Sequence, residues 1–376
     1  MESPFSELQL FITGPTYVRP EVRQAGLWPE FGHRDAENRK RFEPLIENLK
    51  ALAQVPEDYH VIIFNGSGTT AMDASIRSLV AEDETVLNVS VGAFGDLYHK
   101  LAVSNGKQGV QLKFNPGESI ELSRLEEALK EHKPAVVSLT HNETSTGVVN
   151  DIQNACRVIH EHGALALVDG ISIFGGAPSE IGQTRCAMYC TSTQKSLGLP
   201  AGFGIAFVAP EAMKKAEKVT SRGYISDILA QAPRASKYQT LTTPNCTLAN
   251  QAYLQMDYIV NQEGVQNRFD RHTKMRDEVH AFVQDLTGYE LFAPQGYRSP
   301  TVTTIKVPDK VSAAQLKEIK ENLRTQGYLF DPGYGKLNDA LEEAGARPVF
   351  RIGHMGDINM DMLQQYLRAL KGVLPE

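Results

Sequence analysis

The stretch AMYCTSTQKSLGLPAGFGIAFVAP, residues 187–210, places one lysine between two apolar runs. The runs at 187–193 and 203–210 are short and mainly apolar, and such runs predict buried β-strands. Lys195 follows the first run among small hydroxyl residues and precedes a glycine- and proline-rich turn. A lysine at a desolvated strand end can condense with an aldehyde. The stretch therefore indicates a buried sheet and a covalent role for Lys195.

The chain before this stretch alternates short apolar runs with segments of helical periodicity. Mainly apolar strands separated by helices predict an α/β fold with a mainly parallel sheet covered on both faces. Such sheets bind ligands beyond the carboxyl ends of their strands. We expect strands at 59–66, 84–92, 109–117, 134–143 and 164–170, and helices at 69–80, 96–106, 123–132 (capped by Ser123) and 151–163.

The pattern changes after about residue 245. Residues 248–286 predict two helices that meet near Gly264, and a smaller α+β unit follows them. Its expected elements are strands at 300–308 and 348–356 and helices at 312–327 and 358–374, the last with Asp357 as its cap. We divide the chain into an N-terminal arm (1–20) that crosses the surface or a partner subunit, a large domain (21–260) and a small C-terminal domain (261–376).

Composition excludes several classes of protein. A net charge of −7 over 376 residues gives no support for nucleic-acid binding, and no apolar run is long enough to span a membrane. The N-terminus shows no secretion signal. Four irregularly spaced cysteines suit neither a disulfide framework nor a zinc site. We expect a cytoplasmic protein with buried, reduced thiols.

Four features follow predicted strands, and each alone has an ordinary structural explanation. NGSGT at 65–69 could be a tight turn, Asp169 a cap, Lys195 a solvated loop residue and Phe94 part of the core. Together they suit pyridoxal phosphate better. The lysine could bind the aldehyde, the carboxylate could pair with the pyridinium nitrogen, the aromatic ring could stack, and the glycine-rich helix start could hold the phosphate.

The sequence resembles the class V aminotransferases, within the fold type I pyridoxal phosphate enzymes, and among them the alanine–glyoxylate and serine–pyruvate group. That resemblance covers nearly the whole chain and implies a seven-stranded sheet with a smaller C-terminal domain. It is carried by NGSGTTAMDASI (65–76), SVGAFGD (90–96), THNETSTGVV (140–149), LVDGISIFGG (167–176), STQKSLGLPAG (192–202), SPTVTTIKVP (299–308) and FRIGHMG (350–356), and begins at a GPT near residue 14.

The resemblance implies a role for each matching residue. Lys195 would hold the cofactor as a Schiff base and move the proton, Asp169 would pair with the pyridine nitrogen, and Phe94 would stack on the ring. Thr144 would lie near the ring oxygen, and Arg351 would grip the substrate α-carboxylate with a bidentate fork. Contacts to the cofactor phosphate would come from Ser67, Gly68, Thr69 and Gln194.

Two departures from the family pattern concern the subunit interface and the core. The resemblance implies a homodimer whose partner subunit contributes a further phosphate contact, for which Thr242 and Thr243 are candidates. The family often has a tyrosine three residues earlier, where this chain has Gln239 beside Tyr238. Cys186 stands where relatives commonly have an aspartate, a change that we expect to affect packing.

We therefore expect an aminotransferase that moves an amino group from a small L-amino acid, alanine or serine, to glyoxylate or pyruvate in a ping-pong reaction. If Arg34 reached the substrate, a phosphoserine, aminoethylphosphonate or aspartate transaminase would be the alternative, although His33 and Arg34 lie in a loop and suit a structural role. A cysteine desulfurase lacks support because no cysteine lies in a suitable mobile loop. A non-catalytic phosphate-binding protein would not explain Lys195, Asp169 and Arg351.

Overall fold

The large domain is built on one seven-stranded sheet in a computed structural model that describes residues 7–375. Its strands are β2 (His60–Gly66), β3 (Thr85–Ser90), β4 (Gln108–Lys113), β5 (Val136–Thr140), β8 (Leu165–Asp169), β9 (Met188–Ser192) and β10 (Gly202–Val208). The order is β2-β10-β9-β8-β5-β3-β4, and only β10 runs against the others. The predicted seven-stranded, mainly parallel sheet is confirmed.

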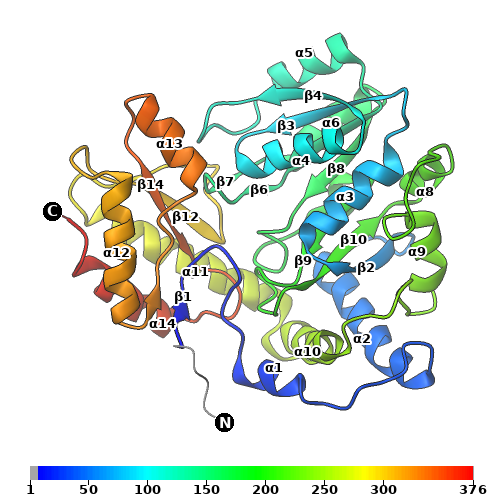
Figure 1. Cartoon of the computed structure of the whole chain (residues 1–376), viewed down its shortest axis with the longest axis horizontal. Coiled ribbons are helices and arrows are strands. Elements are labelled where there is room, and N and C mark those ends of the chain that lie inside the picture. The colour runs from blue at the N-terminus through cyan, green and yellow to red at the C-terminus, as the bar shows by residue number, and fades with distance from the viewer. Residues whose placement is uncertain (1–6, 376) are drawn as a thin grey trace.

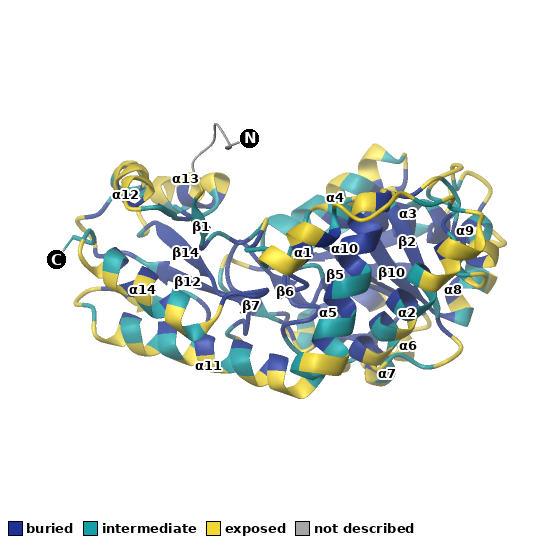
Figure 2. Cartoon of the chain, turned by 90° about the horizontal axis from the view of Figure 1, so that it is seen from below, coloured by how far each residue is buried: buried dark blue, intermediate teal, exposed yellow. Residues whose placement is uncertain are grey.

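Alternation along the strands gives the sheet two apolar faces. In β2, Val61 and Ile63 join one core cluster while Ile62 and Phe64 join another, since successive side chains point to opposite faces. Helices cover both faces, and Figure 2 shows buried strands between helices with exposed outer sides. One cluster includes residues of α1 (Pro20–Ala25), α2 (Ala36–Ala53), α5 (Leu122–His132), α6 (Ile152–Glu161), α7 (Ile181–Thr184) and α10 (Cys246–Asp257). The other includes residues of α3 (Gly68–Leu79), α4 (Ala93–Ser104), α8 (Pro210–Ala216) and α9 (Ile228–Ala235).

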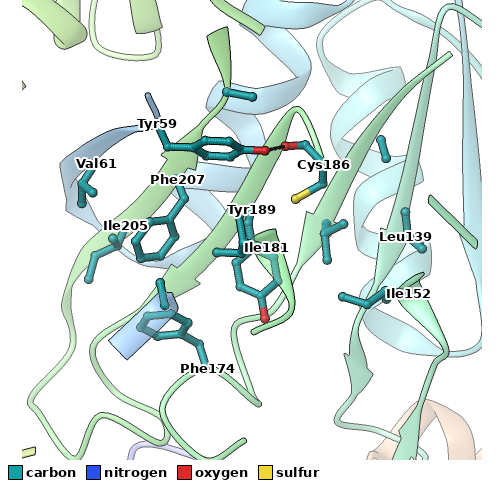
Figure 3. Close-up of a cluster of buried hydrophobic side chains, with 14 of the residues drawn as sticks. Tyr59, Val61, Leu139, Ile152, Phe174, Ile181, Cys186, Tyr189, Ile205 and Phe207 are labelled. Atoms are coloured by element: carbon teal, nitrogen blue, oxygen red, sulfur yellow. Dashed lines mark hydrogen bonds between the residues drawn. The ribbon is translucent and has the colours of Figure 1, made fainter. Parts of the chain in front are cut away.

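Aromatic side chains fill the core around Cys186 (Figure 3). The Tyr59 hydroxyl donates a hydrogen bond of 3.0 Å to the Cys186 carbonyl oxygen, and the Phe174 and Phe207 ring centroids lie 5.2 Å apart. Cys186 is fully buried in this cluster. Its position agrees with the expectation that the substitution affects packing.

The C-terminal domain has its own sheet and core, beside the large domain in Figure 1. Its antiparallel strands are β11 (Glu290–Leu291), β12 (Val302–Lys306) and β14 (Val349–Gly353), and its helices are α11 (Val265–Gln284), α12 (Ala313–Thr325), α13 (Gly335–Glu343) and α14 (Met360–Lys371). A π-helix, η1 (Tyr258–Glu263), joins α10 to Gly264, where the positive φ of 84° ends it and α11 begins. The predicted junction of two helices near Gly264 is confirmed.

The described part of the N-terminal arm packs into the small domain. Strand β1 (Gln9–Leu10) pairs in parallel with β13 (Tyr328–Leu329). Phe11 is fully buried and stacks on Tyr366, with ring centroids 3.9 Å apart. Residues 1–6 of the predicted arm lie outside the described residues, and the predicted boundaries after residues 20 and 260 stay predictions.

Two predicted helix caps are wrong. α14 is capped by Asn359, whose side chain accepts from the Met362 N–H, because Asp357 is taken up by a buried ion pair with Arg268. Helix α5 begins one residue earlier than predicted, and the Ser123 hydroxyl donates to the Glu121 carboxylate. No helix among residues 7–375 combines the length and apolarity needed to cross a membrane.

Candidate active site

The predicted cofactor residues gather at one edge of the large sheet. Asp169 is the last residue of β8, Lys195 follows β9, and residues 67–69 follow β2. These three strands run in the same direction, so their carboxyl ends share an edge. Phe94 lies in the first turn of α4, directly after β3 at the same edge.

The N-terminal segment covers Lys195, which the sequence analysis did not anticipate. Its Nζ donates a hydrogen bond to the Thr13 carbonyl oxygen, and the Thr16 hydroxyl donates to the Lys195 carbonyl oxygen at 2.9 Å. Gly14 leaves room for the lysine, because a Cβ there would lie 2.7 Å from Lys195 Cδ. The only local signal was the GPT motif at 14–16, whose partner in space the sequence does not reveal.

Burial shifts the two titrating groups of this edge toward neutral pH. It lowers the pKa of Lys195 to about 8, with the Arg351 charge acting in the same direction and Asp169 opposing it. Burial raises the pKa of Asp169 to about 7, against a 2.8 Å hydrogen bond from the Ile171 N–H and the Lys195 charge. A lysine whose neutral form is accessible just above neutral pH, beside a carboxyl group, suits acid–base and nucleophilic chemistry.

The start of α3 forms a candidate phosphate site. Gly68 and Thr69 are its first helical residues, and first-turn N–H groups have no partner within a helix. Gly68 packs against the neighbouring strand ends, since a Cβ there would lie 2.3 Å from Ile171 Cδ1. Among the described residues, Ser192 Oγ and Gln194 Oε1 are buried without a hydrogen-bond partner. The helix N-terminus and the unpaired Ser192 hydroxyl at this edge fit a bound phosphate.

Arg351 reaches this edge from β14 of the small domain. Its Nη1 donates to the Thr144 carbonyl oxygen at 3.0 Å, so the predicted Thr144 meets the arginine through its main chain. The Nε and Nη2 groups donate to the Asp331 carboxylate at 3.3 and 3.1 Å. Arg351 and Asp331 are both buried, and the sequence analysis did not identify Asp331.

Glu143 is a second residue that the sequence analysis missed. It belongs to β6 (Asn142–Glu143), which pairs with β7 (Val148–Val149). Its fully buried carboxylate accepts from the Phe94 and Gly95 N–H groups at 3.0 and 3.2 Å and from Ser145. Burial raises the pKa of Glu143. The carboxylate anchors the start of α4 and with it the position of Phe94.

Comparison with known proteins agrees with this geometry. Residues 28–327 match the family model "Aminotransferase class-V". The chain is a class V aminotransferase. It is 30% identical to the L-aspartate–glyoxylate aminotransferase of Paracoccus denitrificans over 98% of this chain and 90% of that protein, and 30% identical to the serine–glyoxylate aminotransferase of Hyphomicrobium methylovorum over 98% and 89%. The crystal structure of an alanine–glyoxylate aminotransferase from Nostoc sp. superposes with a TM-score of 0.90 at 26% identity, covering 99% of this chain and 97% of that one.

In this class V aminotransferase, the loop predicted to reach a partner subunit contacts its own large domain. Thr242 Oγ1 accepts from Asn65 Nδ2 at 3.1 Å, and the Thr243 carbonyl oxygen accepts from the same group at 2.7 Å. The Tyr238 hydroxyl donates to Glu47 at 3.2 Å. Within one chain, the loop therefore lies beside the strand end that leads into the phosphate site.

Arg34 organises this loop. Its guanidinium donates to the Thr240 and Leu241 carbonyl oxygens at 2.7 and 2.8 Å and to the Gln239 side chain at 3.2 Å. These contacts support the structural role expected for Arg34. All four cysteines are buried free thiols, and burial raises the pKa of Cys186 to about 12. The class V aminotransferase therefore presents no exposed thiol of the kind that a desulfurase needs.

Proposed function

We propose that this aminotransferase binds pyridoxal 5′-phosphate covalently through Lys195 Nζ. One observation carries the proposal: Lys195 follows β9, Asp169 ends the neighbouring parallel strand β8, and the charges of Asp169 and Arg351 both act on Lys195. The unpaired Ser192 hydroxyl and the start of α3 fit a phosphate in addition. When bound, this cofactor supplies an electron sink that stabilises negative charge at the donor's α-carbon.

The chain's own residues bind the cofactor and move protons. Asp169, anchored by the Ile171 N–H at Oδ1, keeps Oδ2 for a proton on the ring nitrogen. Lys195 would be the base that takes the α-proton of the donor and the acid that gives it back. Phe94, whose main-chain N–H is bound by Glu143, would stack on the cofactor ring. Thr144 would lie near the ring oxygen, and the residues that would bind the phosphate are Ser67, Gly68, Thr69 and Gln194.

We further propose a donor with a small side chain, alanine or serine, and glyoxylate or pyruvate as acceptor in a ping-pong exchange. Arg351 binds the α-carboxylate. Relatives named as serine–glyoxylate and alanine–glyoxylate aminotransferases support this choice, whereas the Paracoccus relative is named for L-aspartate. Arg34 also supports this choice. Its guanidinium is hydrogen-bonded to the 239–241 loop, a structural role, and is not left to bind the side chain of a phosphorylated or acidic amino donor.

The test is a panel of amino acids added singly to the cofactor-loaded protein. We expect L-alanine and L-serine to convert the visible band of the bound cofactor into that of its amine form, and glyoxylate to reverse the change. Lys195→Ala should show no such turnover. A response to O-phosphoserine alone would exclude the proposed donors, and a protein that stays colourless with added cofactor would exclude the enzyme mechanism.

We also propose a homodimer with shared active sites, located in the cytoplasm. Support comes from large exposed apolar side chains, among them Leu27 (87% exposed) and Tyr224 (71% exposed), which suit an interface. The unpaired cysteines suit a reducing compartment.

Mixed dimers test the shared site. Lys195→Ala subunits should be inactive, and subunits with both Thr242→Ala and Thr243→Ala should bind cofactor weakly. Co-expressing the two should restore activity, because one site of each mixed dimer then combines an intact lysine with the partner's intact threonines. Absence of restored activity in isolated mixed dimers would exclude phosphate binding across the interface.

A further inference from the structure

Asp331 connects three parts of the active site, and neither the sequence motifs nor the family likeness singled it out. It is 5% exposed and follows β13. Its Oδ1 accepts from Arg351 and from the Gly333 N–H at 3.1 Å. Its Oδ2 accepts from the Thr13 N–H at 3.3 Å and the Thr13 hydroxyl at 3.2 Å. Thr13 in turn contacts Lys195 Nζ through its carbonyl oxygen.

These contacts determine which edge of Arg351 can meet a substrate. A guanidinium has five N–H donors. Asp331 takes one on Nε and one on Nη2, and the Thr144 carbonyl oxygen takes one on Nη1. One donor is left on each terminal nitrogen, and these two nitrogens are the ones that can still bind a carboxylate together.

The same contacts change the charge of the substrate site. Asp331 already neutralises Arg351 before any donor binds, at N–O distances of 3.1 Å within buried surroundings. An α-carboxylate on the free edge is still held by two charge-assisted hydrogen bonds. A second carboxylate on a short side chain would enter a site whose arginine charge is already balanced by Asp331, so no unpaired positive charge of Arg351 would offset its desolvation.

We propose that Asp331 is a positioning and specificity-determining residue: it orients the Arg351 fork and disfavours donors that carry a second carboxylate. The inference rests on the proposed binding of the donor α-carboxylate by Arg351. Because Asp331 balances the charge of Arg351, we expect L-aspartate to be a poorer amino donor than L-alanine in this protein. Removing the charge should therefore admit aspartate, and removing the whole side chain should also disorder the fork.

The experiment compares cofactor-loaded wild type, Asp331→Asn, Asp331→Ala and the control Asp339→Asn, which removes the same charge from an exposed position of α13. Single-turnover conversion of the cofactor band gives kcat/KM for L-alanine and L-aspartate. We expect Asp331→Asn to raise the aspartate-to-alanine ratio at least about tenfold. Asp331→Ala should in addition raise KM for alanine about tenfold while kcat changes less than about threefold. Asp339→Asn should match wild type.

A ratio that moves by less than about threefold in both Asp331 variants would overturn the specificity role. Unchanged KM for alanine in Asp331→Ala would overturn the positioning role. Tm and cofactor binding show whether Asp331→Ala folds. If it does not, Thr13→Val takes its place in the experiment. Thr13→Val removes one hydrogen-bond donor to Asp331 Oδ2 and should raise KM for alanine a few-fold. If no amino acid converts the cofactor band of the wild-type protein, the proposed function itself is refuted. That result is separate from the outcomes for the Asp331 variants.

Discussion

Lys195 Nζ donates a hydrogen bond to the carbonyl oxygen of Thr13, a residue 182 positions earlier in the chain. The contact places the N-terminal segment, which also pairs with β13, directly over the proposed nucleophile. The same threonine contacts Asp331, which holds Arg351. A continuous set of contacts thus joins the lysine to the arginine across the two domains.

Gly14→Ala should damage the site without unfolding the protein. A Cβ there would lie 2.7 Å from Lys195 Cδ and 2.8 Å from Nζ, on a backbone with φ of +114°. We expect kcat/KM to fall roughly 10- to 100-fold. Gly296→Ala is the matched control, because Gly296 also has a positive φ but faces open space. Equal losses in both variants would mean that backbone strain, and not the lysine contact, is responsible.

Borohydride reduction of the cofactor-loaded protein should attach the cofactor to Lys195. Mass spectrometry of the digested protein should find the added mass on the peptide that contains Lys195. Lys107 is an internal control, because it is also a buried lysine with a pKa lowered by burial. Labelling of Lys107 or of another side chain would refute the assignment.

Asp169→Asn should retain the fold but lose most activity. The substitution keeps the shape of the side chain and removes the charge that would pair with the ring nitrogen. Loss of one partner of a buried charge pair costs about 3 kcal/mol or more, so kcat should fall roughly 100-fold. Steady-state kinetics with alanine and glyoxylate measure the change. Activity within a few-fold of wild type would show that another group holds that proton.

Arg351→Lys should weaken substrate binding and leave the cofactor bound. A lysine cannot reproduce the two parallel hydrogen bonds of the fork, a loss of about 1.5–3 kcal/mol that corresponds to a rise in KM of roughly 10- to 100-fold. The visible band reports cofactor binding independently of KM. Loss of that band in a folded variant would assign Arg351 to the cofactor instead.

Cofactor uptake by the cofactor-free protein should accelerate as pH rises from about 6 to 9. The neutral amine attacks the aldehyde, and a lysine pKa lowered to about 8 makes that form abundant above this pH. Asp169, with its pKa raised to about 7, becomes ionised over the same range and favours the protonated ring. The initial rate of band formation measures the effect. A rate that keeps rising about tenfold per pH unit up to pH 9, as for a lysine of ordinary pKa, would contradict the shift assigned to Lys195.

Much of the large domain could be predicted because its signals are local. The continuous apolar runs of β2 and β9 and the glycine junction at Gly264 are each encoded in a few consecutive residues. The helix caps were less accessible. Aspartate is a common helix cap, which made Asp357 the predicted one. Its carboxylate instead forms an ion pair with the buried Arg268 of α11, and Asn359 caps α14.

The sequence by itself determined that Lys195 and Asp169 would share an edge of the sheet, because parallel strands place their carboxyl ends together. Only the tertiary structure decided that Thr13 covers Lys195, that Asp331 holds Arg351 and that Glu143 anchors Phe94. Each of these contacts joins segments whose separation follows no periodicity. Their partners depend on how two domains and the N-terminal segment pack, which no local pattern of residues records.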